Sequence, residues 1–220
     1  MKKVLLMGAT GATGKHVLEG LLNDSFFTEV YTISRRPLSL KHPKLHSLLV
    51  DFEQLEQLPI PSMMENLDQL YFCYGTTLKQ AGGKEAFTHI EWDLSLKILH
   101  LAQKLNVKKV LLVSSLGANS KSAVLYQRIK GQIEEYCQKL AFKELVIFRP
   151  SILLTPREVS RTGEEFMQMM TKPLSKVFDR FLPQYAPVKT EVLAHKLIVM
   201  GKTMDLPSVT ILENREIISK

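Results

Sequence analysis

The sequence predicts an α/β fold built on a doubly wound parallel sheet. Short runs rich in Val, Ile and Leu alternate with segments of helical periodicity along the 220 residues. Strands of this composition, separated by helices, indicate a parallel sheet that is covered on both faces. Right-handed crossover connections then extend the sheet in both directions from its first strand. The length fits one domain, which we expect to span residues 1–220.

The expected elements alternate regularly as far as residue 154. We expect strands at residues 2–8, 29–35, 45–52, 68–77, 108–115 and 143–154, and a late strand at 208–212. Helices are expected after the first strand and at residues 87–105, 123–140 and 190–202, where Thr190 is a candidate N-cap. Scattered prolines interrupt the helical and strand patterns between residues 154 and 190. We expect residues 151–190 to form a lid that faces the substrate, with a helix near Gly163–Thr171.

Composition and charge exclude several classes of protein. The net charge of +7 is spread along the chain without a dense basic run, so it does not indicate nucleic-acid binding. The N-terminal apolar stretch ends by Ala9, too early for a signal-peptide core, and no stretch approaches the ~18 apolar residues of a membrane span. The six histidines and two cysteines show no metal-ligand spacing. These features predict a cytoplasmic protein that has no metal site and that binds neither nucleic acid nor membranes.

The stretch MGATGATGKH lies between the first expected strand and the first expected helix. An ATP-binding P-loop would need glycine at position 9 and a hydroxyl at position 16, where the chain has Ala9 and His16. The glycines match a dinucleotide-binding fingerprint, in which they allow a tight turn, close approach to a pyrophosphate and close helix packing. A glycine-rich turn without a ligand is the alternative. The loop residues expected to contact the cofactor are Gly8, Thr10, Gly11, Ala12, Thr13 and Gly14.

The end of the second strand indicates which dinucleotide is bound. An NAD site has an acidic residue about 20 residues after the loop, where it binds the ribose 2′-hydroxyl. This chain has Arg35 and Arg36 there, and two guanidinium groups suit the 2′-phosphate of NADP, although a solvated basic turn is the alternative. Asp51 is a candidate for contact with the adenine amino group, or else a turn-forming residue. Gly75 and Thr76 follow the fourth strand, at the edge where the cofactor should lie.

A serine, a tyrosine and a lysine carry the candidate chemistry. Ser114 and Ser115 end the fifth strand, and Tyr126 and Lys130 lie one turn apart on the helix that follows. An ammonium beside a phenol stabilises the phenolate, so the phenol can exchange a proton with a substrate oxygen while a hydride moves to or from nicotinamide. Lys130 could also hold the ribose hydroxyls, and a serine could donate to the substrate carbonyl. A surface Tyr–Lys pair on an amphipathic helix is the alternative.

The motifs GATGATG, SSLGAN, YQRIKG and VIFRPSILL, in this order and spacing, resemble those of the short-chain dehydrogenase/reductases. The stretches YGTTLKQAGGKEAFTHIEWD, SSLGANSKSAVLYQRIKGQIEE and FRPSILLTPRE are more similar to the atypical branch typified by the Tat-interacting oxidoreductase-like proteins, over residues 2 to about 200. The resemblance implies a Rossmann fold, an NADP-type cofactor, and Ser115, Tyr126 and Lys130 as the catalytic residues, with Ser114 as the alternative serine. It also implies that Pro150 and Ile152 lie beside the nicotinamide carboxamide.

The chain departs from the family pattern at two positions. Ser151 stands where many members have glycine, which alters a backbone contact. The asparagine that completes a proton relay in many relatives has no clear match, and Asp93 occupies its helix.

On the helix of Tyr126, we expect Glu134 and Glu135 to form the outward face.

Together these observations predict an NADP(H)-dependent oxidoreductase that transfers a hydride between nicotinamide and a small carbonyl or alcohol substrate. One alternative is a cofactor-sensing regulatory protein that binds NADP(H) and a protein partner without turnover. Another is a nucleotide-sugar epimerase or dehydratase, which would usually need a larger C-terminal domain than the segment after Pro150 provides.

Overall fold

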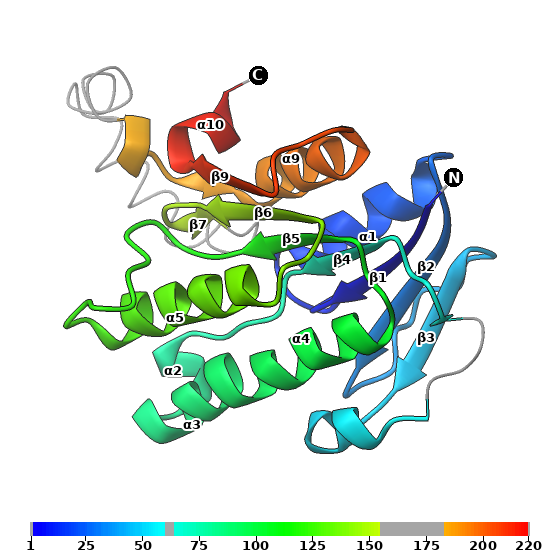
Figure 1. Ribbon diagram of the computed structural model, residues 1–220, viewed down its shortest axis with the longest axis horizontal. Coiled ribbons are helices and arrows are strands. Elements are labelled where there is room, and N and C mark those ends of the chain that lie inside the picture. Colours follow the sequence, from blue (N-terminus) through cyan, green and yellow to red (C-terminus); the bar gives the residue numbers. More distant parts are fainter. Residues whose placement is uncertain (1, 60–63, 155–182, 220) are drawn as a thin grey trace.

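The computed structural model describes residues 2–59, 64–154 and 183–219, and its central feature is a seven-stranded sheet (Figure 1). The strand order is β3-β2-β1-β4-β5-β6-β9, and every neighbouring pair is parallel, as predicted. The strands of this sheet are β1 (Lys2–Met7), β2 (Phe27–Ser34), β3 (Leu45–Leu49), β4 (Gln69–Phe72), β5 (Lys109–Val113), β6 (Glu144–Arg149) and β9 (Val209–Glu213). The order reverses between β1 and β4, where a doubly wound sheet binds its ligand.

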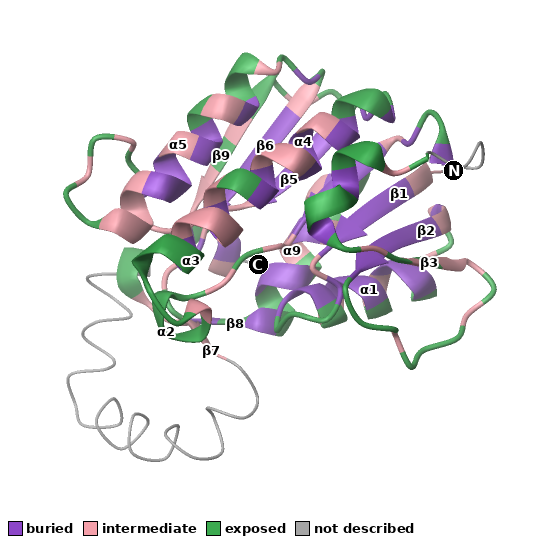
Figure 2. Ribbon diagram, turned by 90° about the horizontal axis from the view of Figure 1, so that it is seen from below, coloured by how far each residue is buried: buried purple, intermediate pink, exposed green. Residues whose placement is uncertain are grey.

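Helices cover both faces of the sheet (Figure 1). One face is covered by α4 (Leu94–Lys104), α5 (Leu125–Lys139) and the 3₁₀ helix η1 (Phe52–Gln57). The other is covered by α1 (Gly14–Asn23), α9 (Thr190–Lys202) and α10 (Asn214–Ile218). Side chains alternate along β1, so that Val4 packs with the α1 side and Leu5 with the α4 side. The central strands are therefore buried on both faces, as the purple strands of Figure 2 show.

The helix expected at residues 87–105 is divided into three parts. They are α3 (Lys84–Thr88), a π-helical segment (His89–Asp93) and α4. A short helix, α2 (Leu78–Ala81), precedes them, and Gly82 ends it in the left-handed conformation at φ 85°. The widened π turn is a local irregularity that apolar periodicity alone does not predict.

Two further expectations are corrected. The strand expected at residues 143–154 is divided at Pro150, which lacks a backbone N–H, into β6 and the short β7 (Leu153–Leu154). Strand β7 pairs in parallel with β8 (Val188–Lys189), which follows a 3₁₀ turn at Pro183–Tyr185. Thr190 is the first residue of α9 and Lys189 is its N-cap, because Lys189 has the extended backbone of a cap position.

Most of the expected lid lies outside the described residues, including the helix expected near Gly163–Thr171. Among the helices that the structure describes, none combines the length and the apolar character that a membrane crossing requires.

Candidate functional site

The glycine loop after β1 is packed too closely for side chains at two of its three glycines. Gly8 has φ +88°, and a Cβ there would lie 2.4 Å from the carbonyl oxygen of Cys73. A Cβ on Gly14 would lie 2.0 Å from the carbonyl oxygen of Gly8. The N–H of Gly11 donates to the same Gly8 oxygen at 2.9 Å, which closes the turn. The loop thus has the tight turn that a dinucleotide fingerprint requires, with its backbone at the N-terminus of α1.

A small cleft opens between this loop and the end of β2. Its lining residues are Gly8, Ala9, Thr10, Ile33, Ser34, Arg35, Arg36, Phe52 and Tyr74. The cleft therefore has two guanidinium side chains and no carboxylate among its described lining residues. The guanidinium of Arg35 lies 5.9 Å from the centre of the Phe52 ring. The Tyr74 hydroxyl is buried without a hydrogen-bond partner in the described part of the chain, and burial raises the pKa of Tyr74 to about 12. An unpartnered donor and two cations suit an anionic, hydrogen-bonding ligand.

Two other predicted cofactor residues lie at the same edge of the sheet. Asp51 is the N-cap of η1, and its Oδ1 accepts a hydrogen bond from the Glu53 N–H at 3.1 Å. That geometry is the turn-forming role considered above, and the contact with adenine stays a prediction. Gly75 follows β4, and a Cβ there would lie 2.9 Å from Glu91 Oε1 and 3.4 Å from Lys130 Nζ. The backbone at Gly75 therefore passes directly over the candidate catalytic lysine.

Tyr126 and Lys130 lie one turn apart on α5, with the Lys130 Nζ 5.9 Å from the centre of the Tyr126 ring. Tyr126 is half-buried and packs against Phe87, whose ring centre is 5.9 Å away. The Lys130 side chain is only 8% exposed, and its Nζ lies 2.8 Å from Glu91 Oε2. Burial alone would lower the pKa of Lys130, but the charge of Glu91, with smaller effects of Tyr126 and Glu134, raises it above its ordinary value.

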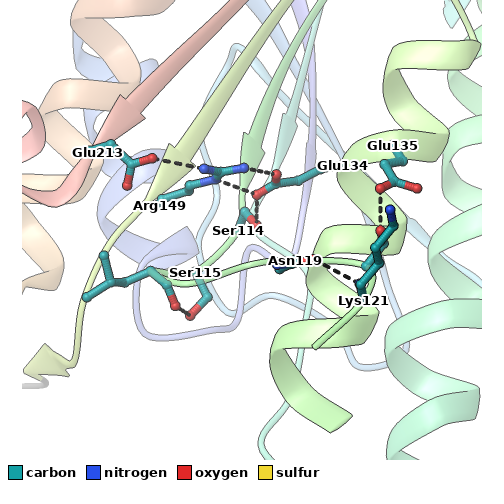
Figure 3. Close-up of polar contacts among 10 residues, drawn as sticks. Ser114, Ser115, Asn119, Lys121, Glu134, Glu135, Arg149 and Glu213 are labelled. Atoms are coloured by element: carbon teal, nitrogen blue, oxygen red, sulfur yellow. Dashed lines mark hydrogen bonds and ion pairs between the residues drawn. The ribbon is translucent and has the colours of Figure 1, made fainter. Parts of the chain in front are cut away.

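The structure separates the two candidate serines (Figure 3). Ser114 is buried and its hydroxyl donates to Glu134. Ser115 is half-buried, and its Oγ has only a 3.3 Å contact with the carbonyl oxygen of Leu116 among the described residues. Ser115 is therefore the serine that could turn toward a substrate oxygen, whereas the Ser114 hydroxyl is already engaged.

The expectation that Glu134 lies on the outward face of its helix is wrong. Glu134 is buried and binds Arg149, whose Nη2 lies 2.6 Å from Glu134 Oε2 (Figure 3). Arg149 also reaches Glu213 Oε1 at 2.9 Å. A buried carboxylate must be paired, and Arg149, at the end of β6, supplies the opposite charge. Glu135, in contrast, is exposed as expected and accepts a hydrogen bond from the Ser120 hydroxyl.

The segment expected beside the nicotinamide is held by backbone and side-chain contacts. The Pro150 carbonyl accepts the Leu116 N–H at 2.8 Å, directly after the two serines. The Ser151 N–H donates to Asn214 Oδ1 at 2.7 Å, and the Ser151 hydroxyl donates to the carbonyl of Ala186. Ile152 is 63% exposed. Ser151 thus contacts α10 and the segment before β8. The hydrogen bond of its hydroxyl gives the serine side chain a structural role at a position where glycine was expected.

Sequence reasoning named Asp93 on this helix and did not identify the carboxylate that faces Lys130. Asp93 is 52% exposed and pairs with His89, with 3.0 Å between Oδ2 and Nδ1. Glu91, two residues earlier, is buried and contacts Lys130 instead. The signal was present in the sequence, because Glu91 interrupts an apolar stripe that includes Phe87 and Leu94 at helical spacing. A carboxylate in such a stripe must have a buried partner.

Comparison with known proteins agrees with this geometry. A family model described as NAD(P)H-binding matches residues 8–161. The chain is 33% identical over 223 residues to Protein HTATIP2 of Rattus norvegicus, covering 99% of this chain and 88% of that protein. It is 33% identical over 210 residues to a protein of Aspergillus fumigatus named "Protein fmp52, mitochondrial", covering 93% and 89% of the two chains.

Solved structures share the fold at low sequence identity. A UDP-N-acetylglucosamine 4-epimerase from Methanobrevibacter ruminantium M1, in complex with UDP-N-acetylmuramic acid, has a TM-score of 0.64 and 18% identity, covering 96% of this chain and 76% of that chain. MoeE5 in complex with UDP-glucose and NAD has a TM-score of 0.69 and 14% identity, with the same coverage of 96% and 76%. Given the family match and the relatives, this chain belongs to the NAD(P)H-binding family, is related to HTATIP2 and has a Rossmann-type fold.

Proposed function

We propose that this protein is an NADP(H)-dependent oxidoreductase that acts on a small carbonyl or alcohol substrate. The observation that carries the proposal is the buried Lys130 ammonium beside Tyr126, at the edge of the sheet where the glycine loop lies. The carboxyl ends of β1, β4 and β5 meet at this edge because the strands are parallel. The loop, the lysine and the half-buried Ser115 are therefore brought together by the fold.

Each residue has a distinct role in this proposal. Tyr126 exchanges a proton between its Oη and the substrate oxygen, and the neighbouring Lys130 stabilises the phenolate that results. Ser115 donates a hydrogen bond to the same substrate oxygen, where negative charge develops during reduction. Lys130 also holds the ribose hydroxyls next to the nicotinamide. The cofactor, when bound, supplies or accepts the hydride.

The preference for NADP over NAD is supported by the charges of the cleft at the end of β2. Arg35 and Arg36 line it, and no ion pair engages either guanidinium among the described residues. Both are therefore available for a 2′-phosphate, which guanidinium groups bind with paired hydrogen bonds. A carboxylate, which would bind a free 2′-hydroxyl and repel a phosphate, is missing from the described lining of this cleft.

Binding and turnover are tested with separate variants. Trp92 allows NADPH and NADH titrations to be followed by energy transfer to the nicotinamide, with calorimetry as a second readout. The variant Arg35→Ala/Arg36→Ala should weaken NADPH binding by roughly tenfold or more while leaving NADH binding nearly unchanged. Tyr126→Phe should bind NADPH normally and lose NADPH-dependent turnover of carbonyl compounds.

Three outcomes would count against parts of this proposal. Tighter binding of NADH than of NADPH would contradict the role of the arginines. Undiminished turnover by Tyr126→Phe would contradict the catalytic assignment. Tight NADPH binding without turnover of a broad carbonyl panel, together with a protein partner whose affinity depends on NADPH, would favour the cofactor-sensing alternative.

A further inference from the structure

We infer that Glu91 is a positioning residue of this site, whose carboxylate fixes Lys130 in its cofactor-facing position and maintains its positive charge. The inference deepens the proposed function and rests on it in one respect, namely that Lys130 binds the cofactor ribose. It assigns a role to a residue outside the Ser–Tyr–Lys set.

The contacts of Glu91 join three parts of the site. Its side chain is 1% exposed, and Oε2 lies 2.8 Å from the Lys130 Nζ. Its Oε1 accepts a hydrogen bond from the backbone N–H of Thr76. Glycine at position 75 allows this arrangement, because a Cβ there would lie 2.9 Å from Oε1 and 3.4 Å from Nζ. Glu91 therefore links Lys130 to the backbone of Gly75 and Thr76, which follow β4.

The π-helical segment explains how Glu91 reaches this position. Glu91 is the third residue of the segment His89–Asp93, and it is the buried one, whereas His89 is half-buried and Asp93 is exposed. Single π turns inside helices are frequent at functional sites, because the extra residue redirects one side chain. Here the redirected side chain is the carboxylate that meets Lys130.

The pair is electrostatically interdependent. Desolvation favours the neutral form of a buried lysine, so an ammonium that is 8% exposed needs a compensating charge. The ionisable groups that act on Lys130 are Glu91 from the π segment, and Tyr126 and Glu134 from its own helix. Among the described residues, only Glu91 forms an ion pair with it. Loss of the Glu91 charge should therefore lower the pKa of Lys130.

The ion pair is compatible with cofactor binding. An ammonium has three N–H donors, and Glu91 can accept from one of them. The remaining donors are free to bind ribose hydroxyls of a cofactor that lies beside Gly75. Glu91 keeps the Lys130 side chain from rotating away from that position. The negative charge of Glu91 also acts on the half-buried Tyr74 and contributes to the raised pKa of that phenol.

The first test measures the lysine itself, without cofactor or substrate. Lysine ammonium groups can be followed by ¹⁵N-edited NMR during a pH titration, and Lys130→Met assigns the signal. In the wild-type protein, the Lys130 signal should persist as an ammonium to a pH above the ordinary lysine range. In Glu91→Gln it should titrate at a pH lower by roughly one unit or more. Asp93→Asn is the matched control, because it removes an exposed carboxylate from the same segment, and it should titrate like the wild type.

The second test measures NADPH affinity against pH. Wild-type affinity should not change up to about pH 10, whereas the affinity of Glu91→Gln should begin to fall at the lower pH at which its Lys130 loses the proton, by up to roughly tenfold per pH unit. The fall should stop at the affinity of Lys130→Met. A purely structural role of Glu91 would lower the affinity equally at every pH.

The outcomes separate the inference from the proposed function. An unchanged Lys130 titration in Glu91→Gln would overturn the inference, even if the wild-type protein binds NADPH. Failure of the wild-type protein to bind NADPH would overturn the proposed function, while the NMR titration would still decide the role of Glu91. If Glu91→Gln does not fold, Glu91→Asp replaces it, and an unchanged Lys130 titration despite the shorter side chain would count against the inference.

Discussion

The hydrogen that Gly14 carries in place of a side chain decides whether the cofactor loop can close. Any Cβ at this position would overlap the carbonyl group of Gly8, which is backbone and cannot rotate away. We expect Gly14→Ala to lower the free energy of unfolding by about 1–3 kcal/mol, as overpacking does, and to abolish measurable NADPH binding. Chemical denaturation and calorimetry measure the two effects.

Gly83→Ala is the control for this substitution. A Cβ on Gly83 meets no atom within 4 Å, and this residue lies away from the loop, at the N-cap of α3. We expect Gly83→Ala to bind NADPH like the wild type. Equal behaviour of the two alanine variants would show that the closure of the loop tolerates a side chain and would refute the steric argument.

At the scale of elements, the Glu134–Arg149 pair connects α5, the helix of Tyr126 and Lys130, to the sheet. Glu134 lies on α5. Of its two partners, Ser114 directly follows β5 and Arg149 is the last residue of β6 (Figure 3). Removing one partner of a buried ion pair leaves the other charge uncompensated, at a cost of roughly 3–5 kcal/mol. Because Arg149 is 23% exposed and keeps Glu213, we expect Glu134→Gln to cost about 3 kcal/mol in denaturant unfolding.

The neighbouring residue provides a matched control. Glu135→Gln makes the same chemical change on an exposed side chain, and surface substitutions usually change stability by less than about 0.5 kcal/mol. If Glu134→Gln were no more destabilising than Glu135→Gln, the buried pair would have no structural importance.

A second connection between elements depends on pH. His89 in the π segment lies 2.6 Å from Glu53 Oε1 of η1, and its hydrogen bonds to Glu53 and Asp93 raise its pKa above 6.5. The stabilisation from His89 is therefore fully present below about pH 6.5 and is lost as the pH rises through the raised value. Hydrogen bonds from Lys97 and His89 lower the pKa of Glu53 below 4.5, so its stabilisation is present above that value and is lost as the pH falls through the lowered one.

The lowered pKa of Glu53 and the raised pKa of His89 define a pH range in which both groups are charged and their ion pair is complete. We expect the difference in Tm between the wild type and His89→Gln to be largest at about pH 5–6 and to shrink toward about pH 9. All of these side chains are substantially exposed except Lys97, so the effect should be small and should weaken in high salt. A difference that grows with pH would have the wrong sign.

At the scale of the whole molecule, cofactor binding should stabilise the fold. The proposed site uses the ends of several strands, so we expect NADPH to bind the native state and not the unfolded chain. At about 100 times the dissociation constant, this linkage contributes roughly 2.7 kcal/mol, which for a chain of this size corresponds to a rise in Tm of roughly 5–10 °C. Arg35→Ala/Arg36→Ala should lose most of this rise at the same NADPH concentration and keep the smaller rise caused by NADH.

The sequence by itself determined the features that depend on local pattern. The apolar runs predicted the strands, the glycine spacing predicted the tight loop, and the i, i+4 spacing placed Tyr126 and Lys130 on one face of α5. These predictions are sound because backbone geometry fixes which residues of one element share a face. The parallel sheet followed from composition and crossover rules, without knowledge of any individual contact.

Only the tertiary structure decided which side chains meet. Glu91 and Lys130 are far apart in sequence, as are Arg149 and Glu213, and no local pattern specifies such pairs. The periodicity of α5 suggested an outward Glu134 because charged residues are usually exposed, yet Arg149 compensates its charge within the core. The same pairing engages Ser114 and leaves Ser115 available. Local sequence pattern determines which residues share a face of a helix or strand. The partner of a buried charge depends instead on how separate elements pack together.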